Sequence, residues 1–495
     1  MRSRVVIVGA GMGGLAAAID LARLGAAVTV LERAAAPGGK MRRVLVDGAG
    51  IDGGPTVFTM RWVFEGLLRD AGTRLEDELQ LNRASILARH AWRDGSRLDL
   101  QADIDRSADA IAEFAGPAEA DGYRRFCERS RQVYQTLERP FIDGQRPSPL
   151  GLTRRVGFTR MDRLLALKPW QAMWPALGEY FRDPRLRQLF GRYATYCGSS
   201  PLAAPATLML VAHVEQDGVW LVDGGMHEVA RTLTRVAAER GAQIRYDAHV
   251  REIATRDGKA TGVILESGEL IAADAVVFNG DCNALAAGHL GKAVSGAVPL
   301  VPPATRSLSA ITWCVHGRTR GFPLTHHNVF FAEDYAREFE SIFGRRRITE
   351  APTVYVCAQD RGADEVIEAP ERLLILVNAP ADGDVAPLRA EQLAEVQSRT
   401  FELMQRCGLV VEGVQTGVRT DPRGFNDLFP ATGGALYGRA THGPFATFAR
   451  PGSRSRIRGL YLAGGSVHPG PGVPMATLSG RRAAESVAQD LQLQA

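Results

Sequence analysis

The residues best placed to do chemistry lie near the start of the chain. Gly9, Gly11 and Gly14 form a Gly-x-Gly-x-x-Gly pattern, and Glu32 follows about 20 residues later. In such a motif the glycines permit a tight turn, close approach of backbone to a pyrophosphate, and close packing of helix on strand. The carboxylate would accept hydrogen bonds from a ribose diol. The pattern predicts a bound dinucleotide, against the alternative of a purely structural glycine turn.

The elements needed to position these residues are encoded around them. Residues 5–8 are a β-branched apolar run typical of a buried parallel strand. Residues 15–22 repeat apolar side chains at helical spacing, and Gly25 should end that helix. Residues 28–31 predict a second strand that closes on Glu32. The helix N-terminus would then face the negative phosphates of the ligand.

A second glycine-rich region favours FAD over a nicotinamide cofactor. Residues 37–41 and 50–56 are both rich in glycine, and a nicotinamide domain has no need for them. The alternative is a pair of surface turns. The arrangement resembles the extended motif of the two-glycine flavoenzymes, the amine-oxidase and desaturase group, in which the second loop would lie against the flavin and its phosphates.

The C-terminal region repeats the same order of elements. Residues 460–463 predict a strand, 464–474 a glycine-rich loop, and 475–491 a helix with small residues at close-packing positions. We therefore expect both ends of the chain to meet on one cofactor. This predicts an α/β fold of the amine-oxidase-like type, in which a discontinuous Rossmann-type FAD domain (1–84, 217–290, 452–495) carries an α+β substrate domain (85–216, 291–451).

The intervening residues indicate mixed secondary structure. Residues 85–100 predict a hairpin, 107–200 a mainly helical subdomain, and 249–278 a β-meander whose third strand is 275–278. The segment 151–170 is basic and amphipathic, so it either lies on a membrane surface or is a solvated face over the protein's own core.

Composition excludes several classes of function. The net charge of the 495-residue chain is +4, which argues against a strongly basic nucleic-acid-binding protein. No run of 18 apolar residues predicts a spanning helix. The six cysteines and ten histidines show no metal-ligand spacing, so no metal is expected, and reduced thiols suit the cytoplasm.

The C-terminal third carries a more specific resemblance, which extends over essentially the whole chain. The chain resembles the bacterial carotenoid desaturases of the phytoene desaturase type, and within them the 1-hydroxycarotenoid 3,4-desaturases of purple photosynthetic bacteria. The segments that carry the resemblance are 420–422, 425–426, 429–434, 436–438, 450–452, 459–461 and 468–470.

This resemblance implies an activity and a location. The family binds FAD, and the expected reaction is hydride transfer from an acyclic carotenoid to flavin N5 followed by proton loss. The bond expected to be oxidised is C3–C4 of a 1-hydroxy- or 1-methoxycarotenoid, within carotenoid biosynthesis. A polyene substrate implies a peripheral enzyme on the cytoplasmic side of the inner or intracytoplasmic membrane. The electron acceptor stays open.

The resemblance also assigns cofactor contacts by motif match. The first glycines would contact the pyrophosphate, Glu32 the ribose, and Val250 the adenine through its backbone. The assigned set is Gly9, Gly11, Gly14, Glu32, Arg33 and Lys40 (diphosphate side), Gly54, Pro55 and Thr56 (isoalloxazine), Val250, and Gly464, Gly465, Val473, Pro474 and Met475 (flavin and ribityl chain). Many relatives carry an acidic or another small residue where Gly465 and Ser466 stand, which leaves the ribityl contact there unassigned.

No catalytic base is required by this chemistry, because a polyene cation has an acidic neighbouring C–H. His468, in the C-terminal glycine-rich loop at 464–474, is the one candidate, and a structural role is the alternative. Selection of a hydroxylated substrate predicts one or two polar side chains at the closed end of an apolar tunnel. The competing hypotheses are phytoene desaturation, an amine oxidase or carotenoid isomerase, and a prenyl-lipid escort protein that has lost its flavin.

Overall fold

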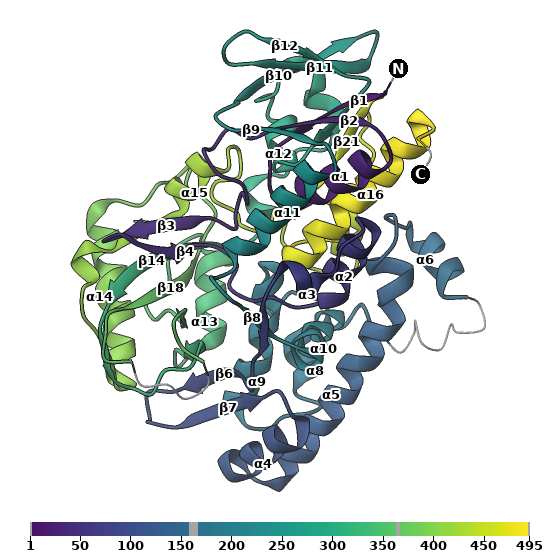
Figure 1. Ribbon diagram of the computed structural model, residues 1–495. Coiled ribbons are helices and arrows are strands. Elements are labelled where there is room, and N and C mark those ends of the chain that lie inside the picture. Colours follow the sequence, from purple (N-terminus) through teal and green to yellow (C-terminus); the bar gives the residue numbers. More distant parts are fainter. Residues whose placement is uncertain (1, 158–166, 363–366, 494–495) are drawn as a thin grey trace.

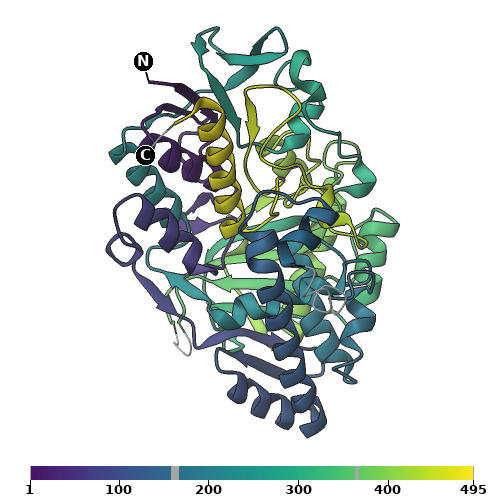
Figure 2. The same cartoon turned by 90° about the vertical axis from the view of Figure 1, so that its right-hand side faces the viewer.

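The computed structural model describes residues 2–157, 167–362 and 367–493. The half of the molecule that contains the N-terminal glycine motif is built on a parallel sheet. Its five strands run in the order β21-β13-β1-β2-β9, and every neighbouring pair is parallel. The strands are β1 (Arg4–Val8), β2 (Ala27–Leu31), β9 (Gln243–Arg245), β13 (Ala275–Phe278) and β21 (Leu460–Leu462). Segments more than 450 residues apart in sequence therefore share one sheet, and both termini lie beside it (Figures 1 and 2).

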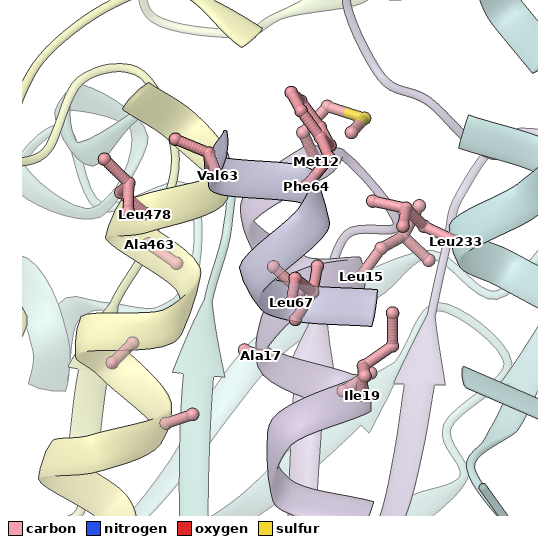
Figure 3. Close-up of a cluster of buried hydrophobic side chains, with 14 of the residues drawn as sticks. Met12, Leu15, Ala17, Ile19, Val63, Phe64, Leu67, Leu233, Ala463 and Leu478 are labelled. Carbon is pink, nitrogen blue, oxygen red and sulfur yellow. The ribbon is translucent and has the colours of Figure 1, made fainter. Parts of the chain in front are cut away.

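Helices cover this sheet and bury its apolar side chains. The helices α1 (Met12–Arg23), α2 (Arg61–Asp70), α11 (His227–Glu239) and α16 (Val473–Leu491) pack together there. Leu15, Leu67, Leu233 and Leu478, one from each helix, gather in this core (Figure 3). The predicted first strand, helix and second strand are confirmed, and Gly25 ends α1 with a left-handed φ of 82°.

The β-meander differs from the sequence prediction in its third strand. The antiparallel meander consists of β10 (Val250–Arg256), β11 (Lys259–Leu265) and β12 (Leu270–Ala272). Residues 275–278, predicted as its third strand, instead form β13 and pair in parallel with β1 and β21. All four side chains of β13 are buried, as suits a parallel strand covered on both faces.

A second, seven-stranded sheet forms the other half of the molecule, in the order β20-β14-β18-β17-β16-β6-β7. All its neighbouring pairs are antiparallel except β16 with β6. The predicted hairpin is confirmed as β6 and β7. The strands are β6 (Ile86–Ala91), β7 (Arg97–Gln101), β14 (Ser309–Gly317), β16 (His327–Phe330), β17 (Val354–Ala358), β18 (Glu371–Ala379) and β20 (Val418–Thr420).

The two faces of this sheet have different partners because side chains alternate along each strand. Ile311, Val356, Ile375 and Val377 belong to a core shared with α14 (Ala390–Arg406), which covers the outer face (Figure 1). The alternate residues face inward. They include Thr312, Tyr355, Leu374, Leu376 and Asn378, and all of them line the central cavity.

The predominantly helical region predicted at 107–200 is present (Figure 2), and its buried side chains pack with those of β6, β7 and β16 of the seven-stranded sheet. Its helices are α4 (Ile104–Ala115), α5 (Pro117–Leu137), η1 (Glu138–Ile142), α6 (Pro149–Val156), α8 (Met173–Leu177), α9 (Pro184–Gly191) and η3 (Arg192–Cys197), followed by η4 (Ala206–Met209) and α10 (Leu210–Asp217). Among the described helices, none is both long and apolar enough to cross a bilayer.

Shorter elements connect these layers. They are β3 (Arg43–Val46), β4 (Ala49–Asp52), α3 (Leu75–Glu78), β5 (Leu81–Arg83), β8 (Trp220–Val222), α12 (Cys282–Ala286), η5 (Lys292–Ala297), η6 (Pro303–Thr305), β15 (Thr319–Gly321), α13 (Tyr335–Phe339), η7 (Glu340–Gly344), β19 (Leu409–Val411), η8 (Val414–Thr416), α15 (Pro422–Leu428) and η9 (Ala446–Ala449). The predicted domain boundaries stay a prediction.

Candidate functional site

One cavity of about 1190 Å³ joins the two halves of the molecule. It is larger than the roughly 300–1,000 Å³ typical of sites for drug-sized ligands. Its walls come from the N-terminal glycine motif, the C-terminal glycine loop, the inner face of the seven-stranded sheet and the helical subdomain. A single ligand of ordinary size would leave part of this space empty, so two molecules can share it.

The N-terminal glycines form the cradle that their spacing predicts. Gly9 has φ = 100°, and its N–H donates to the Leu31 carbonyl at 2.8 Å, which turns the chain between β1 and α1. A Cβ at Gly14 would lie 2.1 Å from the Gly9 carbonyl oxygen, so only glycine lets α1 start so close to β1. Gly11 is the N-cap of α1 and lines the cavity. The N-terminus of α1 can therefore approach an anionic group closely.

Glu32 stands at the end of β2, buried but on the cavity wall. Its Oε2 accepts from the Ala10 amide at 2.8 Å, and its Oε1 accepts from the Ala34 amide at 2.9 Å. An ionised carboxylate has about four lone-pair positions, so two remain for hydroxyl donors. The backbone bonds fix the orientation of the carboxylate before a ligand binds.

The glycine-rich loop at residues 50–56 packs closely against the one at residues 37–41. A Cβ at Gly54 would lie 1.9 Å from the Lys40 carbonyl oxygen. Pro55 and Thr56 line the cavity, and the Thr56 hydroxyl lies 2.7 Å from the Tyr355 hydroxyl on β17. This loop thus joins the cofactor side of the cavity to the inner face of the seven-stranded sheet.

The C-terminal glycine loop closes the same space from the opposite side. Gly464 has φ = 107°, and its amide donates to the Ser479 hydroxyl at 2.8 Å. Gly465, Val473, Pro474 and Met475 line the cavity with the first turn of α16. The cavity is therefore bordered by the N-termini of two long helices, α1 and α16.

Helices α1 and α16 touch through glycine. A Cβ at Gly480 would lie 1.9 Å from the Gly13 carbonyl oxygen, and one at Gly13 would lie 2.8 Å from the Ala476 carbonyl oxygen. The two ends of the chain therefore meet at this packing contact, as expected, and their shared contact with one cofactor stays a prediction. Val250, at the start of β10, is buried and also lines the cavity, on the side of Glu32 and Ala248.

The two basic residues assigned to the diphosphate have protein partners in the structure. Arg33 donates to the carbonyls of Asp427 and Leu428, and Lys40 Nζ donates to the Leu436 carbonyl at 2.6 Å. Burial lowers the pKa of Lys40, although the nearby carboxylate of Asp281 opposes that effect. Both basic residues line the cavity, and their contact with phosphate stays a prediction.

Three polar residues on the cavity wall were missed by sequence reasoning. Asn279 Nδ2 donates to the Gly9 carbonyl at 3.2 Å, and Arg450 donates to the carbonyls of Tyr437 and Gly465. Asp281 Oδ1 caps α12, while its Oδ2 is buried without a hydrogen-bond partner. That free carboxylate oxygen suits a hydroxylated ligand chain. The sequence signal of Asn279 and Asp281 was their position just after a strand, and Arg450 lies in the segment 450–452 that carries the family resemblance.

His468 does not line the cavity, although Phe141 and Pro469 beside it do. Its Nε2 donates to the Gly144 carbonyl at 3.0 Å, and its ring packs edge-on against Phe141. Burial lowers the pKa of His468 to about 4. This geometry favours the structural role for His468 over proton transfer with a ligand in the cavity.

A group of possible metal ligands appears that sequence spacing did not indicate. His326, His327 and Cys357 bring their ligand atoms within 4.8 Å of one another. Both histidines are already engaged, His326 with the Arg361 carbonyl at 3.0 Å and His327 with the Tyr355 hydroxyl at 2.7 Å. We therefore interpret the group as structural, and the absence of a metal stays a prediction.

The rest of the cavity combines a long apolar wall with a few polar groups. The apolar side chains come mainly from η1, α6 and α10, namely Phe141, Ile142, Leu152, Val211 and Val214, with Leu137 at the end of α5 and Leu208 in η4. The polar groups come from η3, α10 and the inner sheet face and include Arg192, Tyr196, Glu215, Thr312, Tyr355 and Asn378. Such a lining suits a long hydrocarbon with a local polar substituent.

Comparison with known proteins agrees with this geometry. The family described as flavin containing amine oxidoreductase matches residues 12–488. The hydroxyneurosporene desaturase of Rubrivivax gelatinosus is 55% identical over 488 residues (98% of this chain, 93% of that protein), and that of Cereibacter sphaeroides is 45% identical over 496 residues (99% and 98%). The cyclohexylamine oxidase of Brevibacterium oxydans has a similar fold (TM-score 0.57, 16% identity, 99% and 100% coverage).

Proposed function

The chain belongs to the flavin-containing amine oxidoreductase family, and from that premise we propose that it is an FAD-dependent carotenoid desaturase of carotenoid biosynthesis. The observation that carries this function is similarity over the full length to hydroxyneurosporene desaturases, with 55% sequence identity in one case. The glycine cradle, the fixed Glu32 carboxylate and the free Asp281 oxygen fit FAD. The bond we assign to the reaction is C3–C4 of an acyclic carotenoid with a hydroxyl or methoxyl at C1.

When bound, FAD supplies the hydride acceptor for the removal of two hydrogens. The protein must then hold the reacting C–H about 3–3.5 Å from its acceptor and exclude water. The apolar wall formed by η1, α6 and α10 would hold the polyene, and the loop at Thr56 fixes the sheet face beside it. No side chain needs to act as a strong base, because loss of hydride makes the adjacent C–H acidic.

A substrate panel tests this function and separates it from its competitors. We expect the FAD-loaded protein to convert 1-hydroxyneurosporene to a product with one more conjugated double bond, seen as a red shift of its absorption bands. Oxidation of amines with formation of hydrogen peroxide, or isomerisation without oxidation, would contradict the proposal. Fast conversion of phytoene with no preference for the hydroxylated substrate would place the protein in another branch.

We also propose that the cavity mouth docks on a membrane surface, where its substrate resides. Leu150, Trp170 and Phe445 are 61%, 65% and 67% exposed, which is unusual for large apolar side chains. Their chain neighbours Pro149, Pro169 and Pro444 line the cavity, as Phe445 itself does. These exposed side chains therefore surround a route from the surface to the apolar wall.

The basic segment 151–170 was the sequence candidate for this contact, and its residues 158–166, with Arg160 and Arg163, lie outside the described residues. Of the described part, Arg155 donates to the carbonyls of Pro140 and Gln145, so its guanidinium stabilises the fold locally. The apolar triad at the mouth is therefore a cleaner test of docking than reversal of the arginines.

Liposome pelleting tests the docking proposal. We expect Leu150→Ser, Trp170→Ser and Phe445→Ser, combined, to lower the pelleted fraction with anionic liposomes several-fold, because roughly 1.5–3 kcal/mol is lost for each large side chain that no longer buries. Leu270→Ser is the matched control, since Leu270 is 63% exposed but lies on β12 of the meander. Equal pelleting of triad and control variants would contradict docking through this mouth.

A further inference from the structure

The inference concerns how the proposed enzyme selects an oxygenated carotenoid, so it rests on the proposed function. An apolar tunnel rejects an added hydroxyl poorly, whereas a buried polar group left unpaired rejects the bare hydrocarbon strongly. The cavity should therefore contain a buried polar group without a protein partner. Among the described residues, four cavity-lining side chains carry such atoms: Arg42, Arg192, Asp281 and Thr312.

Two of these four belong to the cofactor side of the cavity. Arg42 follows the Lys40 loop and donates to Thr420, and Asp281 follows β13 near Gly464. Arg192 opens η3 in the helical subdomain, close to the apolar wall formed by α10, and Thr312 lies on the inner sheet face. Arg192 and Thr312 are therefore the candidates that face a substrate.

Arg192 has the features of a prepared binding group. Its side chain is only 6% exposed, and its Nη1 donates to the Tyr196 hydroxyl at 2.7 Å. Tyr196 in turn donates to Glu215 Oε1, and Tyr193 donates to Glu215 Oε2 at 2.7 Å. This chain balances the buried charge and fixes the guanidinium. The Nε and Nη2 atoms of Arg192 are left without hydrogen-bond partners.

The chemistry of the guanidinium matches the substituent expected on the substrate. Arginine has five N–H donors and no acceptor, so it can donate to the oxygen of an alcohol or of a methyl ether. Thr312 offers a single hydroxyl. The oxygen on C1 lies within about 3–5 Å of C3 and C4, given bonds of about 1.5 Å. Its partner must therefore lie close to the flavin loop, by which we mean residues 50–56, the loop assigned to the isoalloxazine.

The position of Arg192 meets this requirement. Thr56 of the flavin loop contacts Tyr355, and Tyr355 contacts His327 at 2.7 Å. Burial, the neighbouring His326 and the positive charge of Arg192 together hold the pKa of His327 well below its ordinary range. Tyr193 belongs to a buried cluster against which Tyr196 and Tyr355 both pack. Packed side chains therefore connect the flavin loop to the helical turn that carries Arg192.

We propose that Arg192, held by Tyr196 and Glu215, binds the oxygen on the tertiary carbon of the substrate and selects oxygenated acyclic carotenoids over their parent hydrocarbons. A hydrocarbon in the same place would leave the three N–H groups of Nε and Nη2 buried and unpaired. The oxygenated substrate satisfies them and is placed with its C3–C4 bond beside the flavin loop.

The experiment compares kcat/KM for 1-hydroxyneurosporene and neurosporene in the FAD-loaded protein. In the wild-type protein we expect kcat/KM to be about 10²-fold or more higher for the hydroxylated substrate than for neurosporene. In Arg192→Met this ratio should fall to about 10 or less. Thr312→Val is the matched variant, because it removes the other unpartnered polar atom facing the substrate. An unchanged ratio in Arg192→Met, or its collapse in Thr312→Val instead, would overturn the proposal.

Two additions keep the test decisive. If Arg192→Met fails to fold because Glu215 is left as an unpaired buried charge, Arg192→Met with Glu215→Gln removes both charges and is expected to lose the same preference. Binding of both carotenoids to the reduced holoenzyme, which cannot accept hydride, gives a readout independent of turnover. If the wild-type protein desaturates neither carotenoid, the proposed function fails, while the binding ratio still tests Arg192.

Discussion

At the scale of single residues, Glu32 is the clearest test of the cofactor site. Glu32→Ala removes an acceptor for a buried ribose hydroxyl, and a hydrogen bond to a charged group is worth about 1.5–3 kcal/mol. We expect FAD affinity to fall roughly 10- to 100-fold, measured by titration of the flavin-free protein with FAD. The variant also frees the Ala10 and Ala34 amides, which adds to the loss.

Glu269→Ala is the control for Glu32, because Glu269 is an exposed acid paired with Arg245 away from the cavity. It should bind FAD like the wild-type protein. The ribose assignment is wrong if Glu32→Ala retains wild-type affinity and flavin content.

The residue scale also shows where sequence reasoning succeeds and where it ends. Gly9, Gly14 and Glu32 could be predicted because a short, contiguous segment fixes their geometry. Asp281 and Arg192 could not, because their position on the cavity wall depends on packing between distant elements. For Arg192 the decisive fact is its coupling through Tyr196 to Glu215 on another helix, which no local pattern encodes.

At the scale of elements, the contact between α1 and α16 determines whether the two glycine loops can form one site. Gly480→Ala would place a Cβ 1.9 Å from the Gly13 carbonyl oxygen, so the helices must separate. We expect a loss of stability of about 1–3 kcal/mol or more and a loss of bound flavin. Thermal unfolding and flavin absorbance after gel filtration measure both.

Gly296→Ala provides the matched control for Gly480→Ala, because a Cβ at Gly296 would meet no atom within 4 Å. It should keep both the melting temperature and the flavin. A Gly480→Ala protein with wild-type flavin content would show that close approach of α1 and α16 is not needed.

The elements were predicted well where one periodicity dominates, as in β1, α1 and the hairpin β6–β7. The error at 275–278 has a physical reason. Sequence reasoning assigns this run to the meander because it follows the meander strands along the chain. A fully apolar run such as Ala275–Phe278 is, however, typical of a strand buried on both faces. Sheet membership depends on non-local pairing with β1 and β21, which the local pattern does not specify.

At the scale of the whole molecule, buried histidines predict acid sensitivity. Burial lowers the pKa of His442 and of His468 to about 4 each, and His442 Nε2 must be neutral to accept from the Ser200 amide at 3.0 Å. The unfolded chain binds these protons near pH 6.5, so the free energy of unfolding should rise between pH 4 and pH 6.5 and be fully present above that range.

Each fall from an ordinary pKa near 6.5 to about 4 corresponds to about 3 kcal/mol. Urea unfolding at pH 5 and pH 7.5 should therefore give a markedly smaller free energy at pH 5. His468→Gln should reduce that difference, because the titrating group is gone. Equal unfolding free energies at the two pH values would contradict neutral burial of these histidines.

The central claim is that the large cavity brings a flavin and an oxygenated acyclic carotenoid together for hydride transfer. Anaerobic mixing of the oxidised FAD-loaded protein with 1-hydroxyneurosporene tests it most directly, because no external acceptor is present. We expect the flavin absorption to bleach while one equivalent of a carotenoid with one more conjugated double bond appears. Product without flavin reduction, or a flavin that stays oxidised with bound carotenoid unchanged, would contradict the claim.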